Sequence, residues 1–319
     1  MLSSSADEID TLTSYCKATA DQLRLLILRV LAKESFSVLE LCQILDVAQP
    51  ALSHHLKILS AAGLVDTRRQ GTSIFYRRAV ICSIDPIRDL RQSLMDSVDS
   101  IQLSQQILVA IEQVHSARKS QAKQFFEKNF DRFKDNQNLI AEYDNYASCI
   151  TDLLDNTTMG ITGPVIEIGP GDSSLILELT KRFRPVVAID NNTDMLQKTR
   201  NLLQENQLQA EQFFEGELAD YQNPADLIVL NMVLHHLASP SDFFQESYRS
   251  LQLNGCLLIA DLTAHDQDWT RDACGDLWQG FDPEELDRWA VTSGFCLGQS
   301  AYLGLKNGFQ VQIKLFHKF

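Results

Sequence analysis

The chain has 319 residues, of which 45% are hydrophobic, 8% aromatic and 22% charged. This composition is ordinary for a globular protein and excludes collagen-like, coiled-coil-rod and intrinsically disordered chains. It contains no run of 18 apolar residues and no basic, apolar N-terminal leader, so we expect neither a transmembrane helix nor a signal peptide. Seven scattered cysteines without a Cys-x-x-Cys pair predict reduced thiols and a cytoplasmic location.

The formal net charge of −14 is unevenly distributed along the chain. Residues 1–95 hold 11 Lys and Arg against 10 Asp and Glu, whereas residues 96–319 hold 17 against 32. Within residues 46–78, five basic residues stand against two acidic ones. An acidic protein is a poor nucleic-acid binder as a whole, so only the N-terminal part is a candidate for contact with DNA.

The N-terminal part has the pattern of a helix-turn-helix. Residues 20–31 carry apolar side chains at helical spacing. Ser37, with Glu40 three residues later, forms a capping box that begins the next helix. A four-residue break at 46–49 precedes a third helix at 50–62, which begins with proline and is followed by glycine. Two short helices joined by such a tight turn predict a helix-turn-helix.

The helix at 50–62 has an apolar face and a polar face. Leu52, Leu56 and Leu59 share the face that should pack inward. The residues expected to contact DNA lie on the polar face, on its flank or just before the helix: Gln49, Ser53, His54, His55 and Lys57. Two alternating runs around Gln70-Gly71 predict a β-hairpin. Its Arg68 and Arg69 are expected to contact phosphates or the minor groove.

Taken together, these residues resemble the ArsR family of winged helix-turn-helix repressors. The matching text is ADQLRLLILRVL, then LCQILDVAQPALSHHLKILSAAGLV, then the hairpin through YRR, about 80 residues in all. The resemblance implies a DNA-binding domain over residues 1–95, and the alternative is a small helical domain with a solvated basic face. Many ArsR proteins sense metals, but Cys42 stands alone and residues 85–111 contain no His or Cys, so we expect no metal site.

A helix expected at 85–111 carries apolar residues every seven positions. They are Ile87, Leu94, Ile101 and Leu108, with Leu90 and Ile111 on the adjoining seam. A heptad seam favours pairing of helices between two subunits, so we expect residues 96–124 to be a connecting and dimerisation helix and the protein to be a homodimer. The alternative is that this helix packs against its own domain.

From about residue 160, predicted strands and helices alternate. The strands are expected at 165–168, 185–190, 212–214, 227–230 and 256–260. Repeated βα units imply a Rossmann-like, doubly wound parallel sheet, so the fold class of the whole chain is α/β. Asn307-Gly308 between the apolar runs 296–304 and 308–316 predicts a terminal antiparallel β-hairpin.

Ligands of such sheets bind at the carboxyl ends of the strands. The residues expected there are Glu167, Gly169, Gly171, Asp190, Asn191, Glu217 and Asn231. Asp190 can accept the hydroxyls of a ribose, and Glu217 could reach an adenine amino group. The third glycine of a dinucleotide fingerprint is replaced by Ser174. Glu167 would repel a pyrophosphate but suits an ammonium group, which favours S-adenosylmethionine over a dinucleotide.

Residues 125–319 resemble class I S-adenosylmethionine-dependent methyltransferases. The matching text is EIGPGDSS, VVAIDNN, EGEL, LIVLNMVLHHLASP and LNGCLLIADL, with Ser173 in place of a usual glycine. The resemblance implies S-adenosylmethionine or S-adenosylhomocysteine as the ligand. His235 and His236 could be catalytic or could only pack, and residues 261–281 could bind an acceptor or close a lid.

As a whole, the chain resembles ArsR-type DNA-binding domains fused to methyltransferase-like domains. One branch of that family senses S-adenosylhomocysteine and regulates genes of the methionine cycle. The resemblance implies a homodimeric repressor that binds double-stranded operator DNA and uses an S-adenosyl compound as effector. The alternative is an active methyltransferase of an unknown small-molecule acceptor that carries a DNA-binding module.

Overall fold

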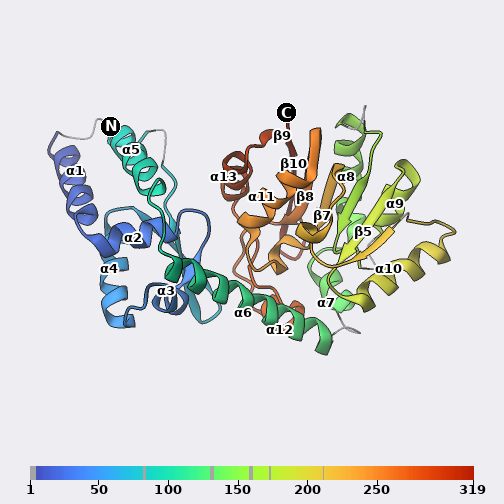
Figure 1. Ribbon diagram of the computed structural model, residues 1–319, viewed down its shortest axis with the longest axis horizontal. Helices are drawn as coiled ribbons and strands as arrows, with labels where there is room; N and C mark the ends of the chain where they lie inside the picture. Colours follow the sequence, from blue (N-terminus) through green and yellow to red (C-terminus); the bar gives the residue numbers. More distant parts are fainter. Residues whose placement is uncertain (1–4, 82–83, 130–132, 158–160, 172–173, 211) are drawn as a thin grey trace. The chain divides into compact units, whose positions relative to one another are not determined.

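The structure, a computed structural model, describes residues 5–81, 84–129, 133–157, 161–171, 174–210 and 212–319. It divides into two units, Met1–Arg118 and Lys119–Phe319 (Figure 1). The division falls within the long helix α6 (Gln105–Asn129). None of the helices in the described ranges is both long enough and apolar enough to cross a membrane.

The N-terminal unit is a helical domain with a small antiparallel sheet. Its elements are α1 (Ser5–Thr19), α2 (Gln22–Val30), β1 (Phe36–Ser37), α3 (Val38–Leu45), α4 (Gln49–Ala61), β2 (Val65–Gln70), β3 (Ser73–Arg78), α5 (Arg88–Asp99) and the first part of α6. The capping box is confirmed, because the Glu40 amide donates to the Ser37 hydroxyl and the Ser37 amide donates to Glu40. The hairpin β2–β3 is also confirmed, and β1 joins it as a third strand.

The turn between α3 and α4 follows from local backbone geometry. Asp46 ends α3 with a positive φ of 53°, and Gly63 follows α4 at φ 64°. Leu52, Leu56 and Leu59 are fully buried, as the helical spacing predicts. The helix-turn-helix is therefore confirmed, with α3 and α4 as its two helices.

The prediction of one helix over 85–111 was wrong. The chain forms α5 and α6 with a break between them, so the segment 96–124 is not a single helix. Ser104 explains the new start, because its hydroxyl accepts the amide of Ile107 and caps α6. The Arg29 side chain holds the carbonyl of Ile101 in the break. The heptad residues are consequently split: Ile87, Leu94 and Ile111 pack on their own domain, whereas Leu90, Ile101 and Leu108 are exposed.

The C-terminal unit is a seven-stranded sheet covered by helices. After α7 (Phe133–Ile140) and α8 (Tyr143–Thr157) come β4 (Val165–Ile168), α9 (Leu175–Arg182), β5 (Val186–Asp190), α10 (Thr193–Glu205), β6 (Gln212–Glu215), η1 (Leu218–Asp220), β7 (Ala225–Asn231) and η2 (Leu234–His236). The remaining elements are α11 (Pro240–Ser250), β8 (Leu251–Leu262), α12 (Trp269–Cys274), α13 (Pro283–Ser293), β9 (Cys296–Gly304) and β10 (Gln310–His317).

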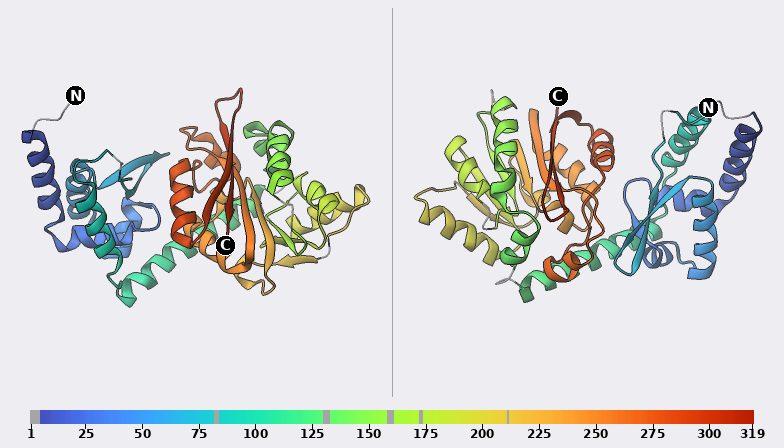
Figure 2. Two further views of the ribbon diagram at one scale, coloured as in Figure 1. Left: turned by 90° about the horizontal axis from the view of Figure 1, so that it is seen from above. Right: turned by 180° about the vertical axis from the view of Figure 1, so that it is seen from behind.

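The strand order β6-β5-β4-β7-β8-β10-β9 confirms the Rossmann-like architecture. All neighbours from β6 to β8 are parallel, and β10 is antiparallel to both β8 and β9. The β9–β10 hairpin, dark red in Figure 2, ends the sheet at one edge. Helices α8, α9 and α10 lie on one face and α11 and α13 on the other (Figure 1). Cover on both faces explains why β4 is buried along its whole length.

Candidate functional site

The polar face of α4 is open to solvent. Gln49, Ser53, His54 and Lys57 are exposed. His55 is half-buried, and its Nδ1 lies 3.6 Å from Oδ1 of Asp21. The side chains predicted to read DNA are thus presented together on one surface.

The basic residues of the hairpin divide into two kinds. Arg69 is exposed near the tip, where its Nε donates to the Gly71 carbonyl at 3.0 Å, and Arg68 is half-buried one residue before it. Arg78, in contrast, donates to the Leu28 carbonyl and forms an ion pair with Asp99. Arg78 therefore stabilises the domain, while Arg69 is placed where it can contact a phosphate.

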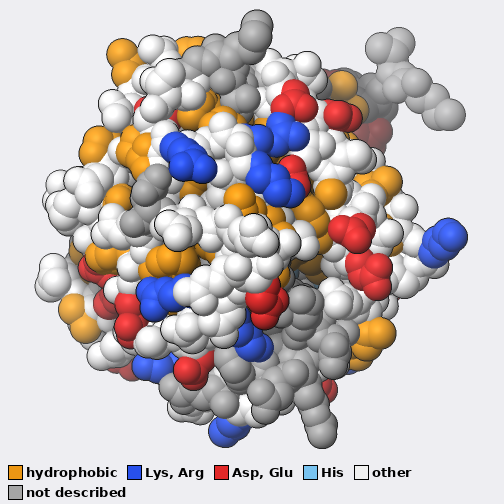
Figure 3. All heavy atoms as spheres, turned by 90° about the vertical axis from the view of Figure 1, so that its right-hand side faces the viewer, with side chains coloured by type: hydrophobic (Ala, Val, Ile, Leu, Met, Phe, Trp, Pro, Cys, Tyr) orange, Lys and Arg blue, Asp and Glu red, His pale blue; other side chains and the backbone are white. Residues whose placement is uncertain are grey.

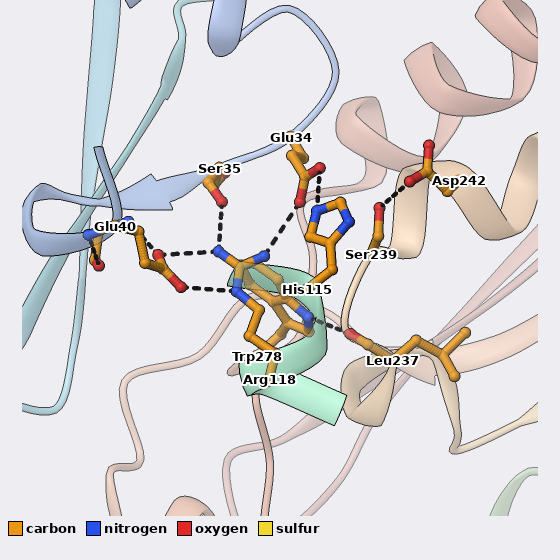
Figure 4. A network of polar contacts seen from close by, with 10 residues as sticks. Glu34, Ser35, Glu40, His115, Arg118, Leu237, Ser239, Asp242 and Trp278 are labelled. Carbon is orange, nitrogen blue, oxygen red and sulfur yellow. Dashed lines mark hydrogen bonds and ion pairs between the residues drawn. The ribbon is translucent and has the colours of Figure 1, made fainter. Parts of the chain in front are cut away.

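A buried ion network joins α6 to the helix-turn-helix (Figure 4). Arg118 donates to Glu34, to both carboxylate oxygens of Glu40 and to the Ser35 carbonyl. Burial raises the pKa of Glu40, but the hydrogen bonds and charge of Arg118 outweigh this and hold it below its usual value. Glu40 also closes the capping box of α3, so the network fastens α6 to the first helix of the helix-turn-helix.

In the C-terminal unit, β4, β5 and β7 bring Glu167, Asp190 and Asn231 to the same edge of the sheet. Glu167 is 1% exposed, and neither carboxylate oxygen has a hydrogen-bond partner among the described residues. Burial therefore raises the pKa of Glu167 well above its ordinary value. A buried carboxyl group without a partner is costly, so this position is suited to a ligand that supplies a cation or donors.

Two tyrosines of α8 lie beside this edge, and sequence analysis missed both. The Tyr146 hydroxyl donates to Asn231 at 2.9 Å, and the Tyr143 hydroxyl is buried without a hydrogen-bond partner in the described part of the chain. Burial, with the nearby Glu167 charge, raises the pKa of Tyr143. Their positions three residues apart on an amphipathic helix before β4 were the only signal available from the sequence.

The loop after β4 and the end of β5 have the expected local geometry. Gly169 and Gly171 both have positive φ values, 61° and 53°, which glycine adopts at low cost. Oδ1 of Asp190 accepts the Asn192 amide at 2.8 Å. Burial raises the pKa of Asp190 to about 6, although that amide hydrogen bond opposes the shift. Asn191 is exposed, and Ser173 lies outside the described residues.

Glu217 stands just beyond β6 but is only partly available. Its Oε2 accepts a hydrogen bond from Nζ of Lys119 at 2.9 Å, and its backbone amide donates to the side chain of Asp220, the last residue of η1. Its side chain is 44% exposed. An adenine amino group would therefore compete with Lys119 for this carboxylate.

His235 is held between two carboxylates beyond β7. Its Nδ1 donates to Oδ1 of Asp261 at 2.7 Å, and its Nε2 lies 3.7 Å from Oδ1 of Asp276. All three side chains are almost fully buried. Burial lowers the pKa of His235, but the two carboxylates outweigh it and the pKa rises to about 9. The two carboxylates thus favour the protonated form of His235 as long as no bound cation replaces the proton on Nε2.

The segment after α12 is packed into the unit. Residues 274–280 are all buried, and the Leu277 and Trp278 amides both donate to the His235 carbonyl at 3.1 Å. The Trp278 ring N–H donates to the Leu237 carbonyl at 2.7 Å (Figure 4). In this structure the segment is a closed cover over η2 and not an open flap.

Two family models match the chain. One, described as a methyltransferase domain, matches residues 114–297, and the other, described as the arsR family of bacterial regulatory proteins, matches residues 21–67. The biofilm growth-associated repressor of Agrobacterium fabrum is 49% identical over 63 residues, which are 20% of this chain and 54% of that protein. An uncharacterized methyltransferase of Staphylococcus carnosus is 30% identical over 136 residues, 41% of this chain and 62% of that protein.

A solved structure shows the same fold in the C-terminal unit. Magnesium protoporphyrin IX methyltransferase from Synechocystis, solved with bound S-adenosylhomocysteine, aligns with a TM-score of 0.53. The alignment covers 63% of this chain and 100% of that one at 15% identity, so it bears on fold alone. The chain belongs to the methyltransferase domain family through residues 114–297, and it joins to that domain an N-terminal helix-turn-helix of the arsR family of bacterial regulatory proteins.

Proposed function

We propose that this protein is a DNA-binding transcriptional repressor whose C-terminal domain binds S-adenosylhomocysteine or S-adenosylmethionine as its effector. Its targets would be genes of the methionine and S-adenosylmethionine cycle, as the whole-chain resemblance implies. The arsR-family match and the exposed polar face of α4 support DNA binding. Figure 3 shows one face of the C-terminal unit, on which acidic and basic side chains are interspersed. A DNA-binding surface, in contrast, has mainly basic side chains.

The observation that carries the effector proposal is the state of Glu167. Its carboxyl group is buried at the carboxyl end of β4, beside the glycine loop, and has no hydrogen-bond partner in the described ranges. The ammonium of an S-adenosyl amino acid would supply the missing positive charge. Asp190, on the neighbouring strand, would accept the ribose hydroxyls. Tyr143 and Tyr146 add hydroxyl groups to the same edge.

The surroundings of His235 favour a sensor over an enzyme. The imidazole is fixed by Asp261 and Asp276, and the backbone of 277–278 closes over it. In this arrangement His235 is held by two carboxylates and is not free to accept a proton from an acceptor. Many methyltransferases need no catalytic base, because they accelerate methyl transfer by holding the donor and the acceptor close together. An experiment therefore has to distinguish the sensor from the enzyme.

The test measures coupling between the two ligands. Double-stranded DNA selected from a random library would be titrated with full-length protein, alone and with saturating S-adenosylhomocysteine or S-adenosylmethionine. Linkage requires that, if the effector changes DNA affinity by some factor, DNA changes effector affinity by the same factor. Calorimetry with and without DNA measures the second half of that relation.

The matched variants are Glu167→Gln and the exposed control Glu205→Gln on α10. We expect the first to weaken effector binding about 10- to 150-fold, because an ionic hydrogen bond contributes about 1.5–3 kcal/mol, and the second to leave it unchanged. Multiple-turnover methyl transfer to a cellular acceptor, with DNA affinity indifferent to both S-adenosyl compounds, would replace the repressor proposal with the enzyme.

A further inference from the structure

Three buried side chains beyond β7 and β8 form a cluster with metal-ligand chemistry. His235 and His236 come from η2, and Asp276 comes from the segment after α12. One candidate donor atom from each lies within 4.8 Å of the other two. Relative exposures of 0%, 8% and 2% place the cluster inside the unit.

One pair of atoms in the cluster is too far apart for a hydrogen bond but close enough to bind the same ion. His235 Nε2 and Asp276 Oδ1 are 3.7 Å apart. His235 Nε2 has no hydrogen-bond partner at ordinary distance among the described residues, whereas the Thr270 side chain stands beside the Asp276 carboxylate as a hydrogen-bond donor. Two atoms that each bind one zinc ion at roughly 2.0–2.1 Å stand about 3.3–3.7 Å apart at angles of roughly 109–130°.

The second ring nitrogen of His235 has the partner that metal-binding histidines usually have. Nδ1 donates to Oδ1 of Asp261 at 2.7 Å, and Asp261 also accepts the Leu262 amide at 2.7 Å. A carboxylate in this place fixes the imidazole tautomer so that Nε2 faces the ion. The His236 ring is oriented by its neighbours, with His235 at 4.1 Å and the edge of Phe126 at 5.0 Å between ring centroids.

We propose that His235, His236 and Asp276 bind one divalent transition-metal ion of the zinc class, with Asp261 as the carboxylate that orients His235. Two imidazoles and one carboxylate favour zinc, cobalt or nickel over magnesium or calcium, which prefer oxygen ligands alone. Three protein ligands leave one position of a tetrahedral ion for water or a substrate atom. The ion would tie η2 to the 274–280 segment, beside the edge of the sheet where Asn231 ends β7. This site is separate from Cys42 and from residues 85–111, where the resemblance to ArsR proteins would place metal ligands.

The first test uses metal-free, full-length wild-type protein. We expect Co²⁺ to bind with one equivalent per chain, to produce visible d–d absorption, and to be displaced by Zn²⁺ but not by Mg²⁺. Nitrogen NMR of the His235 ring should show Nε2 changing on zinc addition while Nδ1 stays protonated. Binding far below one equivalent, or both ring nitrogens still protonated in excess zinc, would overturn the proposal.

The second test uses variants that keep side-chain shape. Asp276→Asn should weaken zinc binding on the order of 100-fold or more, and Asp261→Asn about 10- to 100-fold, the usual cost of losing an orienting carboxylate. His54→Ala, on the exposed face of α4, is the control and should bind zinc as wild type does. Equal zinc affinity in Asp276→Asn and wild type would refute the site. The wild-type titration stands even if a variant does not fold.

The metal proposal and the effector proposal can be refuted independently of each other. Asp276→Asn should retain S-adenosylhomocysteine binding within about threefold, and Glu167→Gln should retain zinc binding. Loss of effector binding alone leaves the metal site in place, and loss of zinc binding alone leaves the effector pocket in place.

Discussion

At the scale of single residues, the carboxyl edge of the parallel sheet carries two carboxyl groups whose pKa values are raised mainly by burial. Glu167 has no hydrogen-bond partner in the described part of the chain, and Asp190 has an amide donor on one oxygen. In the free protein, burial makes the ionised form of these carboxyl groups unfavourable. A ligand that brings a cation or hydroxyl donors makes the ionised form favourable. This energetic state makes both residues suitable for direct mutational tests.

Asp190→Ala should weaken S-adenosylhomocysteine binding about 10- to 150-fold, because two sugar hydroxyls lose a charged acceptor contributing about 1.5–3 kcal/mol. Isothermal titration calorimetry measures the change. Asp194→Ala, exposed in the first turn of α10, is the matched control and should bind normally. An affinity within threefold of wild type for Asp190→Ala would place the ligand elsewhere.

Effector affinity should increase as the pH rises from 5 to 7. In the free protein burial raises the pKa of Asp190 to about 6 and that of Glu167 well above 4.5. Bound ammonium and hydroxyl groups favour the ionised carboxylates, so the complex holds fewer protons than the free protein. Asp190 alone should contribute about a tenfold gain across this range. Calorimetry in two buffers with different ionisation heats should detect proton release, and affinity that falls with pH would contradict the assignment.

At the scale of elements, α4 and the β2–β3 hairpin carry the DNA-binding prediction. Helix α4 buries three leucines and exposes its polar residues, and Arg69 stands exposed near the hairpin tip. Arg118 and its carboxylate partners then anchor α6 to α3. Within this unit, the network therefore links the position of α6 to that of α3.

The double variant Arg68→Ala and Arg69→Ala should weaken binding to all DNA sequences alike. Each arginine bound to a phosphate contributes about one to the slope of log affinity against log salt, so the double variant should have a slope smaller by about one to two. Fluorescence anisotropy across a salt series provides the measurement. Lys306→Ala, in the β9–β10 turn, serves as the control. A folded double variant with wild-type DNA affinity would exclude the hairpin from the interface.

At the scale of the whole molecule, the homodimer remains a prediction. The exposed Leu90, Ile101 and Leu108 are candidates for an interface, together with Ile9 and Leu12 of α1. A twofold protein could read two half-sites about one helical turn apart. Such an interface would be formed by separate elements and not by one long coiled coil, because the chain breaks between α5 and α6.

Leu108→Asp should shift the protein from dimer to monomer and weaken DNA binding, because a charge at an apolar interface remains unpaired. Sedimentation equilibrium measures the mass. Val291→Asp, at an exposed position of α13, should leave the mass unchanged. A wild-type protein that is monomeric at micromolar concentration would refute the dimer itself.

The sequence by itself determined the two kinds of domain, because their signals are local. The Ser37–Glu40 capping box, the leucine spacing of α4, the Asn307-Gly308 turn and the alternation of strands and helices each depend on residues close in the chain. The strand ends also identified Glu167, Asp190 and Asn231, since parallel strands place their carboxyl ends at one edge.

Tertiary structure alone decided what these residues contact. The heptad spacing predicted one continuous helix, but the chain breaks between α5 and α6. Ser104 caps the start of α6, and Arg29 of α2 donates to the Ile101 carbonyl in the break. The contact from Arg29 joins residues far apart in the chain, so local spacing could not reveal it. Tyr143 and Tyr146 reach the carboxyl edge of the sheet only because α8 packs on the sheet. His235, Asp261 and Asp276 come from three separate segments and become one buried cluster, with His235 lying 2.7 Å from Asp261 and 3.7 Å from Asp276. Burial and long-range proximity set the charge states of such groups, and neither can be read from local spacing.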